Sequence, residues 1–210
     1  MEKGNASRLK SLGIAVFEDG DPNENPWVQG KPKAESIEVS DYDPHWVDVF
    51  HSRKADIEVA LGGKALEIEH VGSTAVPGLA AKPVIDIDVI VGDPEDEEGY
   101  VPALSALGYT LTVRERSWYQ HRMFRLDSPR VNLHVFGPEC PEHIRHLLFC
   151  DWLCSHPEDR QRYADAKLLA KHGVDTAQTY NMNKQAVVRD IYQKIFEYYG
   201  VLKADTTSSE

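Results

Sequence analysis

The chain has 210 residues, of which 41% are hydrophobic and 27% charged, and a formal net charge of −11. These values are typical of one globular domain with extensions, and the acidic balance argues against a large DNA- or RNA-binding surface. No apolar stretch is long enough to span a bilayer, no secretion signal is evident at the start, and three cysteines do not form a disulfide framework. We therefore expect a cytoplasmic protein without a membrane or a large nucleic acid as partner.

The first third of the chain combines an extension with one helix. Residues 1–35 are rich in Gly, Pro, Asn and Asp, which predicts an irregular N-terminal extension that Trp27 pins in place. A short strand is expected at Ser36–Val39. Asp43-Pro44 then predicts the start of a helix, because Asp caps helices and Pro fits the first turn, and Gly62-Gly63 predicts its end.

Strands dominate the middle of the chain and helices its end. Runs of β-branched and aromatic residues predict strands at 65–71, 84–91, 109–114, 122–126 and 131–136, with a helix at 96–107. The turn at 128–130 predicts that the last two strands form a hairpin. Three helices follow, at 141–154, 157–172 and 179–199, and residues 201–210 are expected to be a disordered tail. This order predicts an α+β domain over residues 36–200, with a mixed β-sheet, flanking helices and a C-terminal helical cap.

Two carboxylates stand side by side in the second predicted strand. Asp86 and Asp88 share one face, while Ile85, Ile87, Val89 and Val91 share the other, because strand residues alternate with period two. Paired carboxylates on an apolar strand repel each other and are costly to bury. A sheet edge or lysine partners would explain them without function, but Mg2+, which prefers carboxylate oxygens, explains them better.

A Gly-Ser loop precedes this strand. Gly72, Ser73 and Thr74 fit a simple turn as well as a loop whose N–H groups hold phosphate. The nearby Asp pair favours phosphate binding, so together they predict a site for a metal–nucleotide complex.

These residues form part of a longer pattern that resembles the GrpB family, a branch of the nucleotidyltransferase superfamily. The resemblance spans about residues 36–200 and rests on YDPHW (42–46), EHVGSTAVPGLAAKPVIDI (69–87), NLHVF (132–136), LLFCDWL (147–153) and two Tyr-x-x-x-Lys segments (163–167 and 180–184). It implies a nucleotidyltransferase-like fold with a mixed sheet. It also implies that Gly72-Ser73 holds nucleotide phosphates and that Asp86 and Asp88 bind Mg2+ or Mn2+.

One superfamily feature is missing from the pattern. The superfamily places a third acidic residue on a later strand, but the matching strand here carries Asn132 and His134 and no carboxylate. This departure puts a two-metal, polymerase-like mechanism in doubt. A one-metal reaction, or nucleotide binding without transfer, stays open.

Other polar residues have competing interpretations. His134 fits a metal ligand, a base or a phosphate contact, and fits a hydrogen-bonded strand histidine equally well; His70 is more often structural. Lys82, Lys167 and Lys184 are either solvent-facing lysines or phosphate ligands, with Arg122, Arg125 and Arg145 as weaker candidates. The stripe of His143, His146, Cys150 and Cys154 is interpreted as packing and surface residues, because a single helix cannot surround a zinc ion with four ligands.

Three functions remain open on this evidence. The leading hypothesis is a Mg2+-dependent nucleotidyltransferase that transfers a nucleotidyl group from a nucleoside triphosphate to a hydroxyl of an unknown small-molecule or protein acceptor. In it Asp86, Asp88 and His134 are catalytic, and Gly72, Ser73, Thr74, Lys82, Lys167 and Lys184 bind the phosphates. The alternatives are a catalytically reduced nucleotide-binding or accessory module, as GrpB-like domains fused to dephospho-CoA kinase suggest, and hydrolysis with water as acceptor.

Overall fold

The computed structural model describes residues 6–31, 38–170 and 177–202. Its centre is a five-stranded mixed sheet with the order β1-β2-β5-β4-β3. The strands are β1 (Ala65–Val71), β2 (Ile85–Val91), β3 (Thr110–Glu115), β4 (His121–Asp127) and β5 (Arg130–Phe136). β2 and β5 run parallel, whereas all other neighbouring pairs are antiparallel. The predicted hairpin of the last two strands is confirmed by the antiparallel pairing of β4 with β5.

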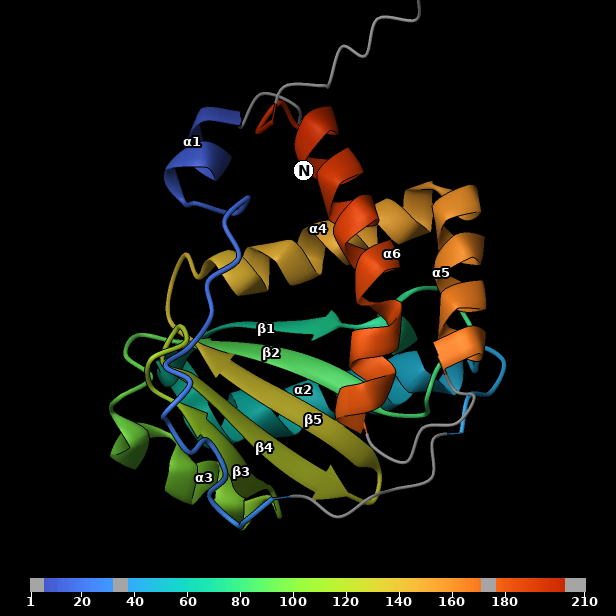
Figure 1. The fold of residues 1–210 in the computed structure, drawn as a ribbon. Coiled ribbons are helices and arrows are strands. Elements are labelled where there is room, and N and C mark those ends of the chain that lie inside the picture. Colours follow the sequence, from blue (N-terminus) through green and yellow to red (C-terminus); the bar gives the residue numbers. More distant parts are fainter. Residues whose placement is uncertain (1–5, 32–37, 171–176, 203–210) are drawn as a thin grey trace, which may run out of the picture.

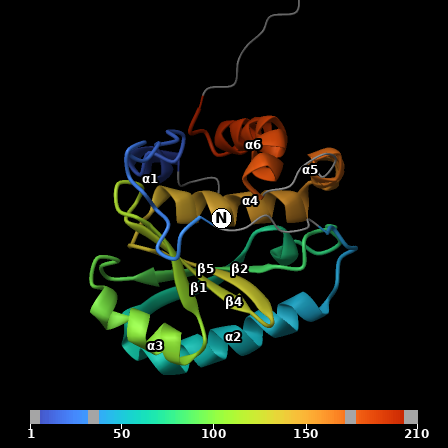
Figure 2. The same cartoon turned by 60° about the horizontal axis from the view of Figure 1, so that its bottom comes forward.

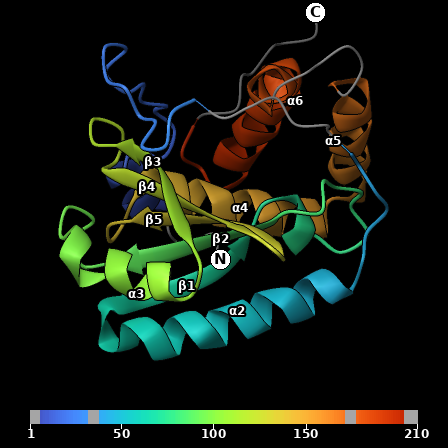
Figure 3. The ribbon, with the colours of Figure 1, turned by 90° about the horizontal axis from the view of Figure 1, so that it is seen from below.

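Helices cover both faces of this sheet (Figures 1 and 2). One face carries α2 (His45–Leu61) and α3 (Val101–Ala106). The other face carries α4 (Pro141–Ser155), with α5 (Pro157–Ala170), α6 (Ala177–Tyr198) and the short α1 (Ala6–Ser11) beyond it (Figure 3). The predicted α+β fold with a mixed sheet, flanking helices and a C-terminal helical cap is therefore confirmed. None of the helices in the described part of the chain is long and apolar enough to cross a membrane.

Two cores separate these layers. Ile85, Ile87, Val89 and Val91 of β2 are buried toward α2 and α3, together with Trp46, Phe50 and Ile57 of α2. The second core joins α1, α4, α5, α6 and the loop residues Val76 and Leu79. The opposite face of β2 carries Asp86 and Asp88 toward α4. The period-two prediction is confirmed, and it places both carboxylates between the sheet and the cap.

Some predicted elements differ from the observed ones. The helix expected at 96–107 is a 3-10 turn, Glu97–Gly99, followed by α3. Pro102 explains the late start of α3, because proline lacks an N–H and is tolerated in the first helical turn but not inside a helix. The strand expected at Ser36–Val39 begins outside the described residues, and its described part makes no strand; Ser40 forms only an isolated bridge with Ala81. Residues 171–172 of a predicted helix end and 203–210 of the predicted tail also lie outside the described residues. The prediction of a disordered tail is wrong for Val201, which is buried in the cap core.

The N-terminal segment is more ordered than its composition predicts. It contains α1, and Leu9 and Ile14 are buried in the cap core. Further along, Trp27 pairs with Val113 of β3 as an isolated bridge, and the carbonyl of Pro26 accepts a hydrogen bond from Arg114. The backbone around Trp27 therefore attaches this segment to β3.

Candidate functional site

The site is built on the parallel strands β2 and β5. Asp86 lies opposite Asn132 and Asp88 lies opposite His134 in the register of the two strands. The Asn132 amide donates a hydrogen bond to Asp86 Oδ1 at 3.0 Å. Neither Asn132 nor His134 supplies a carboxylate, so the strand beside the Asp pair lacks the third acidic residue, as the sequence predicted.

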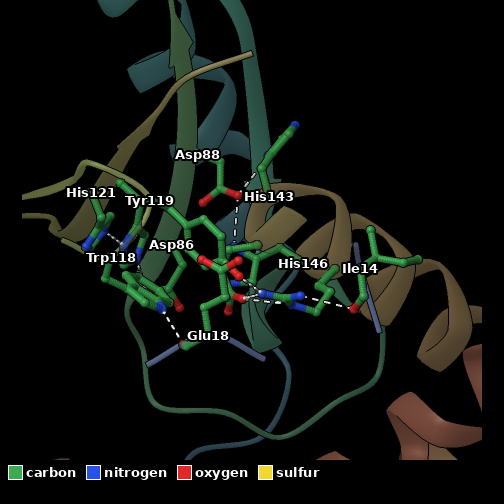
Figure 4. A network of polar contacts seen from close by, with 12 residues as sticks. Ile14, Glu18, Asp86, Asp88, Trp118, Tyr119, His121, His143 and His146 are labelled. Carbon is green, nitrogen blue, oxygen red and sulfur yellow. Dashed lines mark hydrogen bonds and ion pairs between the residues drawn. The ribbon is translucent and has the colours of Figure 1, made fainter. Parts of the chain in front are cut away.

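Two histidines of α4 hold Asp88. The Nδ1 atoms of His143 and His146 both lie 2.9 Å from Asp88 Oδ2, and the Asp88 side chain is fully buried (Figure 4). Burial by itself raises the pKa of Asp88, but the charge of His146 and hydrogen bonds from both histidines outweigh it and hold this pKa well below its usual range. Burial lowers the pKa of His146, but the charges of Asp88 and Glu142 prevail and raise it to about 10.

This arrangement corrects the interpretation of His143 and His146 as packing and surface residues. Both contact Asp88 of the candidate site, because α4 lies on the face of the sheet to which Asp88 points. Their i, i+3 spacing, which places both on one helix face, was the available signal in the sequence. Cys150 and Cys154 of the same stripe do not join them: Cys150 is buried with its thiol 3.5 Å from the Gly72 carbonyl, and Cys154 is exposed.

The second oxygen of Asp88 has a different environment. Oδ1 is buried and has no hydrogen-bond partner within the described residues. A buried carboxylate oxygen without a partner is costly, so native structures retain one mainly where a ligand, water or ion completes it. Asp88 Oδ1 is therefore a candidate ligand position beside Asp86.

The Gly-Ser loop approaches Asp86 closely. Gly72 has φ of 72° and ψ of −169°, and a Cβ added to it would lie 2.5 Å from Asp86 Oδ2. Only glycine fits this combination of backbone conformation and contact. The loop then turns through a 3-10 helix, Ser73–Ala75. The predicted juxtaposition of the Gly-Ser loop and the Asp pair is thus present in the structure.

Thr74 supports this loop from inside. It is fully buried, its hydroxyl donates to the Val84 carbonyl at 3.1 Å, and the His70 Nε2 lies 3.0 Å from the same hydroxyl. Burial lowers the pKa of His70 to about 4, so this histidine is neutral and donates its Nε2 proton to Thr74. We therefore assign Thr74 to the shape of the loop, whereas Ser73 keeps its predicted phosphate role.

His134 closes the site on the β5 side. Its Nε2 lies 4.0 Å from Asp86 Oδ1, and its Nδ1 lies 2.9 Å from His121 Nε2. His121 Nδ1 in turn contacts Glu115 Oε2 at 2.7 Å. Burial and the neighbouring His121 lower the pKa of His134 to about 3, so it is neutral at pH 7. Burial also raises the pKa of Asp86 to about 6, against the Asn132 hydrogen bond and the charges of His146 and Lys184.

Two of the three predicted lysines, Lys167 and Lys184, lie on the cap helices α5 and α6. Lys167 is 2% exposed, donates to the Ala80 carbonyl and lies 4.8 Å from the Tyr163 ring centroid. Burial and the charge of Lys184 lower its pKa to about 7. Lys184 contacts the Tyr163 hydroxyl at 3.3 Å, and its charge also acts on Asp86. Lys82 is half-buried in the segment that leads into β2, and its phosphate role stays a prediction.

The weaker arginine candidates have other partners. Arg122 is buried and pairs with Glu97 at 2.8 Å, and Arg125 pairs with Asp127 at 2.5 Å. Arg145 is 1% exposed and pairs with Glu142. Arg122 and Arg145 are therefore poor candidates for phosphate binding, because their guanidinium groups are already buried against protein partners.

The sequence of this chain is similar to a known protein family and to named bacterial proteins. The GrpB protein family matches residues 36–194. UPF0157 protein BH1888 of Halalkalibacterium halodurans is 45% identical over 165 residues, which cover 78% of this chain and 85% of that protein. A Mycobacterium tuberculosis protein named dephospho-CoA kinase is 30% identical over 183 residues, but only 45% of its length is covered.

A solved structure agrees with the fold. The crystal structure of conserved protein GrpB from Enterococcus faecalis superposes with a TM-score of 0.69 at 30% identity, covering 78% of this chain and 99% of that one. The family match spans more than half of the chain and includes the Gly-Ser loop, the Asp pair and α4. The chain belongs to the GrpB family.

Proposed function

We propose that this protein binds a nucleoside triphosphate together with Mg2+ or Mn2+ and transfers a nucleotidyl group to a hydroxyl acceptor. The observation that supports this proposal is the close contact between a loop suited to phosphate and a pair of carboxylates suited to a metal ion. The Gly72-Ser73 loop, with its backbone N–H groups, meets Asp86, and Asp88 beside it keeps a buried oxygen without a described partner. Phosphate and a divalent cation are the ligands that such a pair of elements suits.

The residues present fit Mg2+ held jointly by protein and nucleotide. Within the described ranges, no group of three His, Cys, Asp or Glu side chains is arranged to hold a metal by itself. Mg2+ is commonly bound by one or two carboxylates, with substrate phosphates and water completing its octahedron. Asp86 and Asp88 are the two carboxylates that would hold it. When bound, the ion would neutralise charge on the phosphate oxygens.

The remaining residues have distinct roles in this proposal. Gly72 and Ser73 cradle phosphate oxygens, and Lys184, whose charge already acts on Asp86, offsets their negative charge. Asp86 orients the acceptor hydroxyl, and neutral His134 offers a hydrogen-bonding nitrogen beside it. The acceptor oxygen would then bond to the α-phosphorus while the bond from the α-phosphorus to the bridging oxygen breaks and pyrophosphate leaves, and the hydroxyl proton would pass to the Asp86 carboxylate. Because the surface is acidic, a small molecule or a protein suits this role better than a large RNA.

A second candidate function is nucleotide binding without transfer. The strand beside the Asp pair carries Asn132 and His134 and no carboxylate, and His146 supplies a positive charge next to Asp88 from within the protein. Such a module would serve as an accessory unit. The alignment with a protein named dephospho-CoA kinase fits that reading, although this chain spans under half of it.

Calorimetric titration separates these possibilities. ATP, GTP, CTP and UTP are titrated, with and without Mg2+, into the wild type, an Asp86→Asn/Asp88→Asn variant and an Asp48→Asn control on α2, across the sheet. The proposal predicts Mg2+-dependent binding to the wild type and the control, and its loss in the double variant. If no nucleotide binds to folded wild type, both nucleotide functions are wrong.

Product analysis then distinguishes the reactions. Labelled nucleotide transferred to an acceptor, and abolished by Asp86→Asn, supports nucleotidyl transfer. Binding without turnover across many acceptors supports the accessory module. Steady release of pyrophosphate or phosphate without any acceptor shows hydrolysis instead.

A further inference from the structure

The N-terminal segment 6–18 contacts α4, the helix whose histidines hold Asp88. Leu9 and Ile14 are buried in the cap core, and Phe17 packs against Tyr192 at 5.5 Å between ring centroids. The Glu18 carbonyl accepts a hydrogen bond from the Trp118 indole at 3.0 Å. This segment precedes the family match at residues 36–194, and the proposed function gives it no task.

Arg145 is the point where this segment meets the site. Its guanidinium donates to the carbonyls of Ile14 and Val16 at 3.0 and 3.1 Å and to the Tyr119 hydroxyl at 3.0 Å. It also lies 4.8 Å from the Phe17 ring centroid. Arg145 is 1% exposed. Displacement of the N-terminal segment would therefore leave its charge buried without these acceptors.

The remaining guanidinium N–H groups hold Glu142. Nε and Nη2 of Arg145 lie 2.8 and 2.5 Å from Glu142 Oε2. The other oxygen of Glu142 lies 3.4 Å from His146 Nε2. His146 Nδ1 then contacts Asp88 Oδ2 at 2.9 Å (Figure 4). One continuous series of charged groups, Arg145, Glu142, His146 and Asp88, therefore runs from the N-terminal segment to the site.

His143 provides an internal comparison. It contacts the same Asp88 oxygen at 2.9 Å from the same helix, but its Nε2 faces Glu67 at 3.5 Å and not Glu142. The series from Arg145 thus reaches one of the two histidines only. A loss of general packing would affect both, whereas a loss of this series would affect His146 alone.

We propose that residues 6–18 are part of the functional site. They fix the guanidinium group of Arg145, Arg145 fixes Glu142, and Glu142 holds the His146 imidazole on Asp88. Arg145 and Glu142 are positioning residues, and the N-terminal segment is the support that fixes Arg145. A lysine at position 145 cannot replace it, because one ammonium has three donors and no planar fork for two carbonyls, a hydroxyl and a carboxylate. The contacts from the N-terminal segment to His146 do not depend on a bound nucleotide. Their importance for Mg2+–nucleotide binding rests on the proposed function.

The test uses proton NMR of the full chain without nucleotide. The hydrogen-bonded Nδ1 protons of His143 and His146 are assigned by their loss in His143→Gln and His146→Gln. The proposal predicts that Arg145→Lys loses the His146 signal through exchange with water and retains the His143 signal. Phe17→Ala loosens the N-terminal segment without altering Glu142. It is expected to weaken the His146 signal and to retain the His143 signal. Leu168→Ala, of similar exposure on α5, is the matched control and is expected to retain both signals.

Two outcomes would overturn the proposal. Retention of the His146 signal in both Arg145→Lys and Phe17→Ala would show that His146 is held on Asp88 without the N-terminal segment. Equal loss of the His143 and His146 signals would show that the packing of α4 is loosened in general. If Arg145→Lys does not fold, Phe17→Ala decides alone. Mg2+–nucleotide titration of the same variants comes afterwards, so a failure of the proposed function leaves the NMR result intact.

Discussion

Substitution of Gly72 is expected to disturb both stability and the site, for two separable reasons. With φ of 72° and ψ of −169°, Gly72 occupies backbone space that side chains avoid at a cost of about 1–3 kcal/mol. An alanine Cβ would also lie 2.5 Å from Asp86 Oδ2 and 3.1 Å from Asp86 Cβ, so the loop or Asp86 must shift. Overpacking of this kind typically adds about 1–3 kcal/mol.

Two other glycines separate these contributions. Gly78 has φ of 77° but open space at its Cβ position, and Gly92 has open space without positive φ. We expect losses in the free energy of unfolding of about 2–6 kcal/mol for Gly72→Ala, about 1–2 kcal/mol for Gly78→Ala and under about 0.5 kcal/mol for Gly92→Ala.

Urea unfolding at constant m-value measures these differences, and calorimetry measures Mg2+–nucleotide affinity in the same proteins. Gly72→Ala alone should lose affinity, because it alone displaces Asp86. A Gly72→Ala protein as stable as Gly78→Ala, with unchanged affinity, would refute the reasoning. In an Asp86→Ala background, Gly72→Ala should lower the free energy of unfolding by less than in the wild type, because the contact with the carboxylate is gone.

Three further predictions concern residues that support the site. Glu97, whose pKa is lowered to about 2 by hydrogen bonds from Arg114 and Arg122, should contribute about 2–3 kcal/mol to stability at pH 7. Since its folded pKa is depressed, that contribution is present above about pH 4.5 and is lost as the pH falls toward 2. Urea unfolding of wild type and Glu97→Gln should therefore differ at pH 7 and converge at low pH, and a pH-independent difference would contradict this account. Thr74→Val should cost about 1–3 kcal/mol, because the Val84 carbonyl and His70 Nε2 lose a buried partner; an exposed control, Thr110→Val, should change little. Lys167, whose pKa is lowered to about 7 by burial and by Lys184, binds fewer protons folded than unfolded between about pH 7 and 10. The wild type should thus gain stability relative to Lys167→Met over that range, and parallel pH profiles of the two proteins would show that Lys167 titrates normally.

Local patterns in the sequence determined most of the fold. Strand alternation put Asp86 and Asp88 on one face and four apolar residues on the other, because the period of two is a property of the extended backbone itself. The β4–β5 hairpin and the ends of α2 followed from turn and capping residues, whose preferences act over a few positions. The absence of a carboxylate on β5 could likewise be predicted, since it needed only the identity of that strand.

Only the tertiary structure decided which distant groups complete the site. His143 and His146 lie more than fifty residues from Asp88, and their helix spacing is equally compatible with a surface stripe. Their contact with Asp88 depends on where α4 lies on the sheet, and long-range packing of the cap sets that position, which no local periodicity encodes. The same holds for the N-terminal segment, whose loop-like composition did not predict α1. Its order comes from burying Leu9 and Ile14 in the cap core and from hydrogen bonds with Arg145, which lies more than a hundred residues away in the sequence.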